Sequence, residues 1–354
     1  MFLFIIYPDQ SVSLLAMSVI RLVKRTPKSA FTNVMNSGWR WGEPEYFSSK
    51  LYGADVGMAF WDLGSRNAKE TILLTHGEPS WSYLYRRMID PLLAEGYRVV
   101  LFDQVGFGWS DKPTETTDYS YERHVAWNED LLFNHLDLTN LTAVFQDWGG
   151  LIGLRVAARS PQRFSRLVLT NTVFPTCDTK YEGGEYISQG FYSWKDYAYH
   201  GGLKGENKVG QMMGRAAQGP ACGPDGKLTA EEMAAYQAPF PDDTFMAGAH
   251  VFPELVPTPA SDPTGRPQPV GGDANRALWS VYEQWAKPVL LAFSDSDPVL
   301  GNSDYIWREK CPGTKGQPHI TVKGGHFSQD GGGEELVSAL IQFVNRPGGN
   351  HCKL

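Results

Sequence analysis

The stretch Leu141-Thr-Ala-Val-Phe145-Gln-Asp147-Trp-Gly-Gly150 decides the fold of this chain. Residues 141–145 are apolar or β-branched, which predicts a buried strand, and residues 149–158 follow a helical pattern. A strand that turns sharply into a helix, with glycines directly behind the turn, is the setting of a nucleophile elbow. The apex residue is Asp147, where the motif G-x-S-x-G of serine esterases would place Ser, and the chain contains no such motif. The alternative is that Asp147 only caps the following helix, where Asp is common.

Strand-like runs and helical patterns alternate on both sides of this stretch. Near-continuous apolar strands separated by helices predict a parallel sheet that is covered on both faces. The expected strands are Glu45–Ser49 and Gly57–Trp61 as a hairpin, then Thr71–Thr75, Tyr97–Asp103, Leu141–Phe145, Arg166–Thr170, Pro288–Phe293 and His319–Val322. The expected helices are Trp81–Ala94, Ser120–Leu136, Gly149–Ala158 and Glu334–Phe343.

The pattern changes between residues 176 and 286, where Gly- and Pro-rich loops alternate with short helical stretches and no apolar strand run occurs. The capping box Thr229-Ala-Glu-Glu232 marks one helix start there. Pro-rich Val256–Val270 predicts a long surface loop. We expect this segment to be a helical cap over the carboxyl ends of the strands, where open α/β sheets bind ligands.

The domain prediction follows from these patterns. We expect an α/β core built from residues 17–175 and 287–354, with the cap inserted as residues 176–286. Residues 1–16 are expected to be an N-terminal extension outside the fold, because Met17 with the basic residues behind it resembles a second start. The apolar run at residues 1–7 lacks the basic start and the cleavage site of a signal peptide and is too short to span a bilayer.

Composition limits the function classes. The 354 residues carry a net charge of −7 with no basic block, which argues against a nucleic-acid partner. Eleven Trp residues and 13% aromatic side chains suggest an apolar pocket as well as a core. The four cysteines, at positions 177, 222, 311 and 352, form no CxxC pair. They predict reduced thiols in a cytoplasmic protein, with no metal site.

Two more reactive side chains follow late strands. Ser294-Asp-Ser-Asp297-Pro298 places a carboxylate behind one strand, and Gly324-Gly-His326-Phe327 places an imidazole behind the last. Nucleophile, carboxylate and histidine in this chain order match the α/β-hydrolase arrangement. The order therefore predicts catalytic roles for Asp147 and His326, with Asp295 or Asp297 as the acid.

The loop His76-Gly-Glu78-Pro79 follows an earlier strand and occupies the usual place of an oxyanion hole. The backbone N–H groups of Glu78 and Trp148 would be its two donors. We expect structural roles for His76 and for Asp103, which follows the next strand.

These motifs together resemble the haloalkane dehalogenases, and within them the subfamily with Glu in the loop and a second halide-binding Trp in the cap. The resemblance extends from about Arg25 to the final helix, and it includes the segment Gly190-Phe-Tyr-Ser-Trp194-Lys195. It favours Asp297 over Asp295 as the acid, because Pro298-Val-Leu-Gly301 follows in the family pattern. The departures are the N-terminal extension, the Gly-rich stretch 204–227 and the Pro-rich stretch 256–270.

The resemblance implies a reaction. Asp147, already ionised, would displace halide from a haloalkane and form an ester. The indole N–H groups of Trp148 and Trp194 would bind the halide. His326, oriented by Asp297, would activate water to hydrolyse the ester to a primary alcohol. We expect no cofactor, no membrane partner, and a monomer or weak homo-oligomer.

Three alternatives stay open at this point. An epoxide hydrolase would share the Asp nucleophile and use cap tyrosines, of which this chain offers Tyr181, Tyr186, Tyr192, Tyr197 and Tyr199. Gln146, Glu78 and the Trp194 segment favour the dehalogenase. A non-catalytic binder predicts a broken triad, and a cofactor-free oxygenase or luciferase on the same fold is the third alternative.

Overall fold

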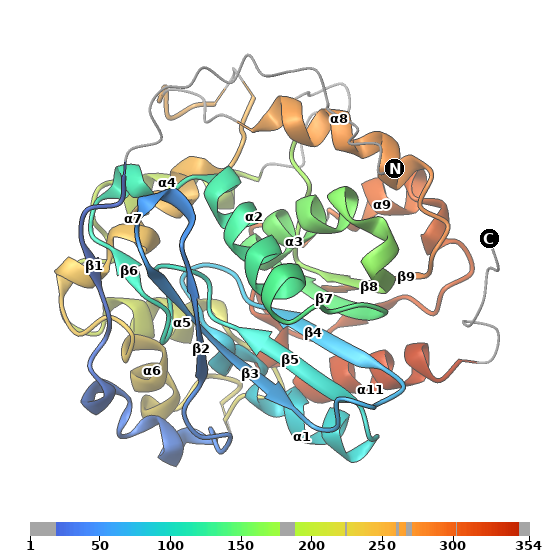
Figure 1. Ribbon diagram of the computed structural model, residues 1–354, viewed down its shortest axis with the longest axis horizontal. Helices are drawn as coiled ribbons and strands as arrows, with labels where there is room; N and C mark the ends of the chain where they lie inside the picture. The colour runs from blue at the N-terminus through green and yellow to red at the C-terminus, as the bar shows by residue number, and fades with distance from the viewer. Residues whose placement is uncertain are drawn as a thin grey trace.

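The computed structural model describes residues 19–177, 188–223, 225–259, 262–266, 271–301 and 303–346. Within these residues, eight strands form one sheet in the order β2-β3-β5-β4-β7-β8-β9-β10 (Figure 1). The six strands β5, β4, β7, β8, β9 and β10 run parallel, and β3 is antiparallel to both of its neighbours. The strands are β2 Glu45–Ser49, β3 Val56–Leu63, β4 Thr71–Thr75, β5 Arg98–Phe102, β7 Leu141–Gln146, β8 Phe164–Thr170, β9 Val289–Ser294 and β10 Ile320–Val322. The predicted fold class, a mostly parallel sheet, is confirmed.

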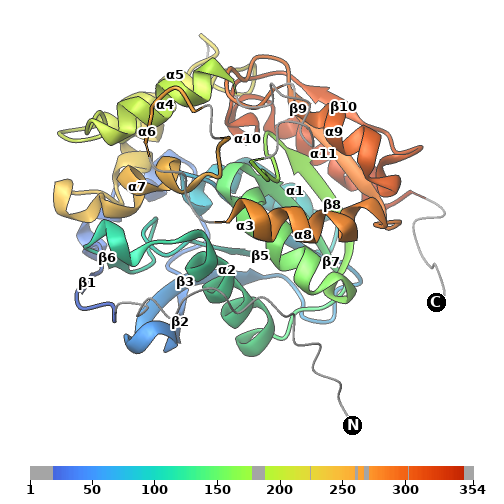
Figure 2. The same ribbon diagram turned by 90° about the horizontal axis from the view of Figure 1, so that it is seen from above.

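Helices cover both faces of the sheet (Figures 1 and 2). Helices α1 (Arg86–Ala94) and α11 (Gly333–Val344) pack together on one face, and α2 (Tyr121–Glu129), α3 (Asp147–Arg159) and α8 (Gly272–Glu283) lie on the other. Every residue of β7 and of β9 is buried, as expected for parallel strands between two helical layers. The remaining elements near the sheet are α9 (Asp304–Lys310), α10 (Ser328–Gly331) and the short pair β1 (Val23–Lys24) and β6 (Lys112–Pro113).

Two helices differ from the sequence prediction. The helix expected from Trp81 begins as a 3₁₀ turn over Ser82–Tyr85, and α1 starts only at Arg86. The Ser82 N–H donates to Asp103 Oδ1 at 2.8 Å, so this turn is tied to the end of the neighbouring strand. The second expected helix is α2 followed by a π-helical turn at Asp130–His135.

The inserted segment is helical where it is described. It carries α4 (Gln189–Tyr199), α5 (Lys208–Ala216), α6 (Ala230–Gln237) and α7 (Ala247–Leu255), and no strand occurs among its described residues. The capping box at Thr229 is present at the start of α6. Helix α8 packs against α3, and Arg155 Nε donates to Asn275 Oδ1 at 2.9 Å across this contact. The division of the chain at residues 176 and 286 stays a prediction.

The described part of the Pro-rich segment lies only partly at the surface, where Pro263 and Gly265 are exposed. Its residues Thr258 and Asp262 are buried, and both hydrogen-bond inside the protein. Residues 260, 261 and 267–270 lie outside the described part of the chain. The buried residues lie against α4, because Asp262 pairs with the buried Lys195 of that helix.

Some predictions concern segments that the structure does not describe. The expected extension, residues 1–16, and the cysteine at position 352 lie outside the described ranges. Cys222 and Cys311 are buried thiols that form no disulfide among the described residues. Among the helices of the described residues, none has both the length and the apolar character that crossing a membrane requires.

Candidate active site

The turn between β7 and α3 holds Asp147 in a left-handed backbone conformation, with φ of 48°. A non-glycine residue adopts this conformation at a cost, and such strained residues cluster at functional sites. The Asp147 N–H donates to the carbonyl of Asn171 at 3.0 Å, and Thr172 Oγ1 donates to the carbonyl of Asp147 at 2.9 Å. The residues just after β8 therefore hold both the N–H and the carbonyl group of Asp147.

The two glycines behind the elbow allow close packing. A Cβ at Gly149 would lie 2.3 Å from the carbonyl oxygen of Thr75, and a Cβ at Gly150 would lie 1.9 Å from Thr172 Oγ1. Side chains at these positions would push α3 away from the neighbouring strand ends. The glycines predicted to form the elbow thus let Asp147 project above the sheet.

The loop after β4 reaches the same carboxylate. The Glu78 N–H donates to Asp147 Oδ1 at 2.8 Å. A Cβ at Gly77 would lie 2.2 Å from that oxygen, so glycine is required for this approach. The Trp148 N–H belongs to the first turn of α3, where backbone donors have no partner within the helix. The two predicted oxyanion donors are therefore next to Asp147.

The structure brings His326 and Asp297 to the nucleophile. His326 Nδ1 lies 2.9 Å from Asp297 Oδ2, and His326 Nε2 lies 3.4 Å from Asp147 Oδ2. The other oxygen of Asp297 accepts the Val299 N–H at 2.7 Å. Asp295, the rejected candidate, forms an ion pair with exposed Lys323 at 2.7 Å.

The pKa values of His326 and Asp297 are shifted in opposite directions. Burial opposes protonation of His326, but the carboxylates Asp297 and Asp147 outweigh it and raise its pKa to about 10. Burial likewise opposes ionisation of Asp297, but the charge and hydrogen bond of His326 hold its pKa below the ordinary value. In the free protein the imidazolium therefore lies between two carboxylates.

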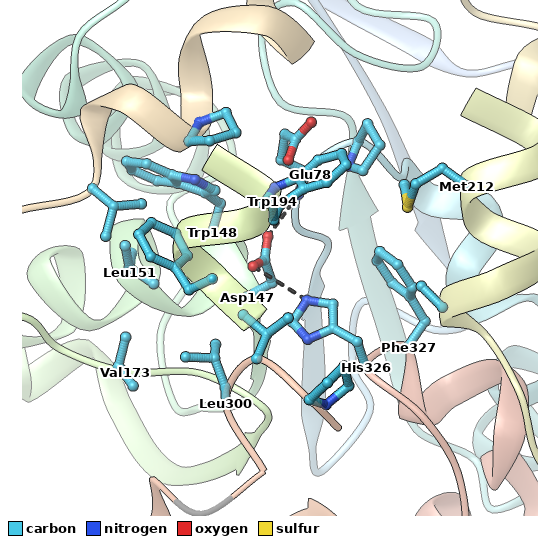
Figure 3. A pocket seen from close by; sticks show the side chains of 17 residues that line it. Glu78, Asp147, Trp148, Leu151, Val173, Trp194, Met212, Leu300, His326 and Phe327 are labelled. Atoms are coloured by element: carbon cyan, nitrogen blue, oxygen red, sulfur yellow. Dashed lines mark hydrogen bonds and ion pairs between the residues drawn. The ribbon is translucent and has the colours of Figure 1, made fainter. Parts of the chain in front are cut away.

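A cavity of about 120 Å³ opens beside Asp147 (Figure 3). Its ionisable residues are Asp147, Glu78 and His326, and the rest of its lining is apolar or aromatic. The core supplies strand-end residues, while α4, α5, α7 and the chain just after α7 supply the opposite wall. The lining consists of Glu78, Pro79, Asp147, Trp148, Leu151, Val173, Phe191, Trp194, Met212, Ala216, Pro253, Val256, Pro298, Val299, Leu300, His326 and Phe327.

Both predicted halide-binding tryptophans line this cavity. Trp148 is buried and meets the rings of Tyr121 and Phe252 edge-on. Trp194 comes from α4 and is partly buried, with the Tyr197 ring 5.9 Å away. Figure 3 shows the two indoles on the same side of Asp147.

The cap tyrosines that an epoxide hydrolase would use are not at the cavity where they are described. Tyr192, Tyr197 and Tyr199 are absent from its lining, and Tyr197 Oη donates to the carbonyl of Gly202. Tyr181 and Tyr186 lie outside the described residues.

The Glu78 side chain is an unusual member of the lining. It is buried, and its Oε1 atom has no hydrogen-bond partner. Burial, followed by the nearby Asp147 carboxylate, raises its pKa well above the ordinary value, against weaker opposing effects of Trp194 and His326. Burial and the neighbouring carboxylate thus favour the neutral form of the Glu78 carboxyl.

His76 and Asp103 have the contacts expected of structural residues. His76 Nε2 accepts the Gln104 N–H at 2.9 Å, which places the ring proton on Nδ1, 2.9 Å from the carbonyl of Gly77. Asp103 accepts the N–H groups of Ser82 and Trp109 at 2.8 and 2.7 Å. Neither side chain lines the cavity.

Asn171 was missed by the sequence analysis. Besides accepting the Asp147 N–H, it donates through Nδ2 to the carbonyl of His326 at 2.8 Å and to Ser294 Oγ at 2.8 Å. It therefore links the ends of three strands that carry site residues. Its position directly after the predicted strand 166–170 was the only available signal.

The Gly-rich stretch 204–227 contacts the histidine loop. The Gly325 N–H donates to the carbonyl of Gln218 at 2.8 Å, and the Ala221 N–H donates to the carbonyl of Gly331 at 2.8 Å. A Cβ at Gly325 would lie 2.4 Å from the carbonyl oxygen of Ala216. This departure from the family pattern thus packs against the loop that carries His326.

Comparisons with known proteins show which family this chain resembles. Residues 70–213 match the family model described as alpha/beta hydrolase fold. A haloalkane dehalogenase of Psychrobacter cryohalolentis is 40% identical over 330 residues, which cover 91% of this chain and 98% of that protein. One from Mycobacterium marinum is 38% identical over 321 residues, with 91% and 99% covered. The solved structure of the tetrameric haloalkane dehalogenase DpaA from Paraglaciecola agarilytica NO2 has a TM-score of 0.73 and 28% identity, with 94% of this chain and 100% of that chain covered.

Proposed function

The chain belongs to the haloalkane dehalogenase family, and from that premise we propose that it hydrolyses haloalkanes through an ester on Asp147. The observation that carries the proposal is the arrangement of Asp147, His326 and Asp297 beside a cavity lined by Trp148 and Trp194. The net reaction converts a haloalkane and water to an alcohol, a halide ion and a proton.

In the first step a carboxylate oxygen of Asp147 attacks the carbon that bears the halogen. A carbon–oxygen bond forms, the carbon–halogen bond breaks, and the halide leaves with the electron pair. Indole N–H groups suit this anion because they donate and have no competing acceptor. In an apolar, water-poor pocket such donors stabilise developing charge more strongly than they would in water. Trp148 and Trp194 take this role.

In the second step a water molecule attacks the ester carbonyl of Asp147. His326 Nε2 accepts the proton of the water, and Asp297 stabilises the resulting imidazolium. The N–H groups of Glu78 and Trp148 bind the tetrahedral oxyanion. Breaking the ester bond releases the alcohol, which takes its proton from His326. Asp147 is left as a carboxylic acid and returns to the carboxylate by losing the second proton of the water to solvent.

The size of the cavity supports short substrates. An engineered apolar cavity of about 150 Å³ holds one benzene molecule. At about 120 Å³, the cavity of this protein suits haloalkanes of a few carbons. We propose primary, short-chain haloalkanes as the substrate class.

The epoxide hydrolase is the second candidate, since it uses the same nucleophile and the same histidine and aspartate. Its epoxide-activating tyrosines are not among the cavity residues that are described. A non-catalytic binder or an oxygenase gives no reason for an aspartate nucleophile to lie in line with His326 and Asp297. A cytoplasmic location and a monomer or weak homo-oligomer stay predictions.

The test is halide release by the purified protein from chloro-, bromo- and iodoalkanes of increasing length, with epoxides of matched length as controls. We expect halide release from the short members, with falling rates for longer chains, and no diol from the epoxides. Diol formation without halide release would establish the epoxide hydrolase instead. Release of neither product would contradict both hydrolase assignments.

A further inference from the structure

The Pro-rich segment, a departure from the family pattern, forms a buried ion pair next to Trp194. Lys195 follows Trp194 in α4, and its Nζ lies 2.6 Å from Asp262 Oδ2. Neither side chain of this pair has exposed surface. A buried ammonium group is costly unless a partner and hydrogen bonds compensate it, so this contact strongly constrains α4.

Asp262 organises the segment around this contact. It accepts hydrogen bonds from Thr258 Oγ1 and from the N–H of Thr264, both at 2.8 Å, in addition to the bond from Lys195. Burial opposes its ionisation, but the hydrogen bonds from Lys195 and Thr264 lower the pKa of Asp262 to about 2. The carboxylate is thus charged at neutral pH and holds both its own loop and α4.

Arg266 makes a second set of contacts with α4. Arg266 Nη1 donates to Asp196 Oδ1 at 3.1 Å, and its guanidinium lies 4.4 Å from the centre of the Tyr199 ring. The Nε atom of Arg266 donates to Glu254 of α7 at 3.1 Å. We call residues Thr258, Asp262, Thr264 and Arg266 the brace. The brace therefore ties α4 to α7, and none of its residues lines the cavity.

The start of α4 is fixed at a different place. Ser188 Oγ donates to the carbonyl of Pro298, the residue after Asp297, at 2.9 Å. Ser188 also caps the helix by accepting the Phe191 N–H. Helix α4 is thus held at its start by the loop of the catalytic acid and further along by the brace, with Trp194 between the two attachments.

We propose that Asp262, through its buried ion pair with Lys195, is a positioning residue that fixes the Trp194 indole for halide binding. The inference rests on the proposed halide-binding role of Trp194. A hydrophobic pair of similar volume could stabilise the cap equally well, but it would not fix the direction of the contact. Small displacements of groups that stabilise a transition state matter, since about 1 Å costs on the order of 10²-fold.

The experiment compares Asp262→Asn with the wild type and with Asp62→Asn. Asp62 forms a largely buried ion pair with Arg98, 2.6 Å apart, and neither residue lines the cavity. The readouts are the bromide dissociation constant from tryptophan fluorescence, KM and kcat for a bromoalkane, and the thermal midpoint. We expect Asp262→Asn to raise the bromide dissociation constant and KM about tenfold or more. Asp62→Asn should lower the thermal midpoint and leave bromide binding unchanged.

If Asp262→Asn does not fold, the test uses a double variant, Lys195→Met with Asp262→Leu. It removes the unpaired ammonium and restores stability, but bromide binding should stay weak because the directional contact is lost. Wild-type bromide affinity in Asp262→Asn, or in the double variant, would overturn the positioning role. Trp194→Phe tests the halide-binding role of Trp194 separately from the positioning role of Asp262. If this variant binds bromide as the wild type does, the halide-binding role is wrong, and the positioning role is wrong with it.

Discussion

His326 Nε2 lies 3.4 Å from Asp147 Oδ2, so the proposed base of the second step contacts the proposed nucleophile of the first. Asp147 contributes to the raised pKa of His326 by its charge and its hydrogen bond. Esterification removes that charge. If the proposed ester forms, the pKa of His326 should therefore fall, and the neutral imidazole becomes available as a base.

This relationship predicts two different pKa values for one residue. In the free enzyme the pKa of His326 is raised to about 10, so the ring is protonated at neutral pH. Hydrolysis of the ester needs the neutral ring, so its rate should rise with pH and level off above a pKa lower than that of the free enzyme. Imidazole NMR of the free enzyme and single-turnover kinetics across pH would check this. Equal values from the two measurements would contradict it.

Asp297→Asn should slow ester hydrolysis about 10²-fold or more, because the amide cannot stabilise the imidazolium. Alkylation should continue, giving one halide per active site in a rapid burst. Asp295→Asn is the matched control, since Asp295 contacts exposed Lys323 and not His326. It should retain wild-type turnover, and loss of activity in this control would show that the acid was wrongly assigned.

Trp148→Phe and Trp194→Phe should each weaken halide binding roughly ten- to hundredfold, because a hydrogen bond to a charged group contributes about 1.5–3 kcal/mol. Isothermal titration with bromide measures the loss without relying on fluorescence. Trp285→Phe is a suitable control, since Trp285 is buried outside the cavity. Unchanged affinity in both cavity variants would mean that the halide binds elsewhere.

Halide affinity should fall as pH rises through the raised pKa of Glu78, because its carboxylate form repels an anion in the same cavity. Below that pKa the carboxyl is neutral and the repulsion is absent. Glu78→Gln stays neutral throughout and should remove this part of the pH dependence. His326 and Asp147 are the other charged groups near Glu78. To remove the titration of His326, Glu78→Gln and the protein with Glu78 intact are both compared in a His326→Gln background. Identical pH profiles with and without Glu78 would contradict the prediction.

Local pattern was sufficient for much of the site. The pattern of a strand, a turn and two glycines predicted Asp147, and its order along the chain predicted His326. Both predictions depend on the carboxyl ends of parallel strands lying at one edge of the sheet. The choice of Asp297 over Asp295 needed the family resemblance, since both follow the same strand.

Contacts between distant segments were not predictable from the sequence. Asn171 joins three strand ends, Gln218 binds the histidine loop, and Asp262 binds α4. The contacts of Gln218 and Asp262 depend on how the insertion folds back over the sheet, and those of Asn171 depend on which strands become neighbours. No local periodicity encodes either. Proline content suggested an exposed loop at 256–270, but the need to neutralise buried Lys195 placed Asp262 inside.

If Asp147 is the nucleophile and His326 acts only in ester hydrolysis, a variant without the imidazole should stop at the ester. Mass spectrometry of His326→Gln treated with a bromoalkane tests it directly. We predict one released bromide per active site and an alkyl adduct on the peptide that contains Asp147. A folded His326→Gln variant that binds bromide normally yet forms no adduct would contradict the account.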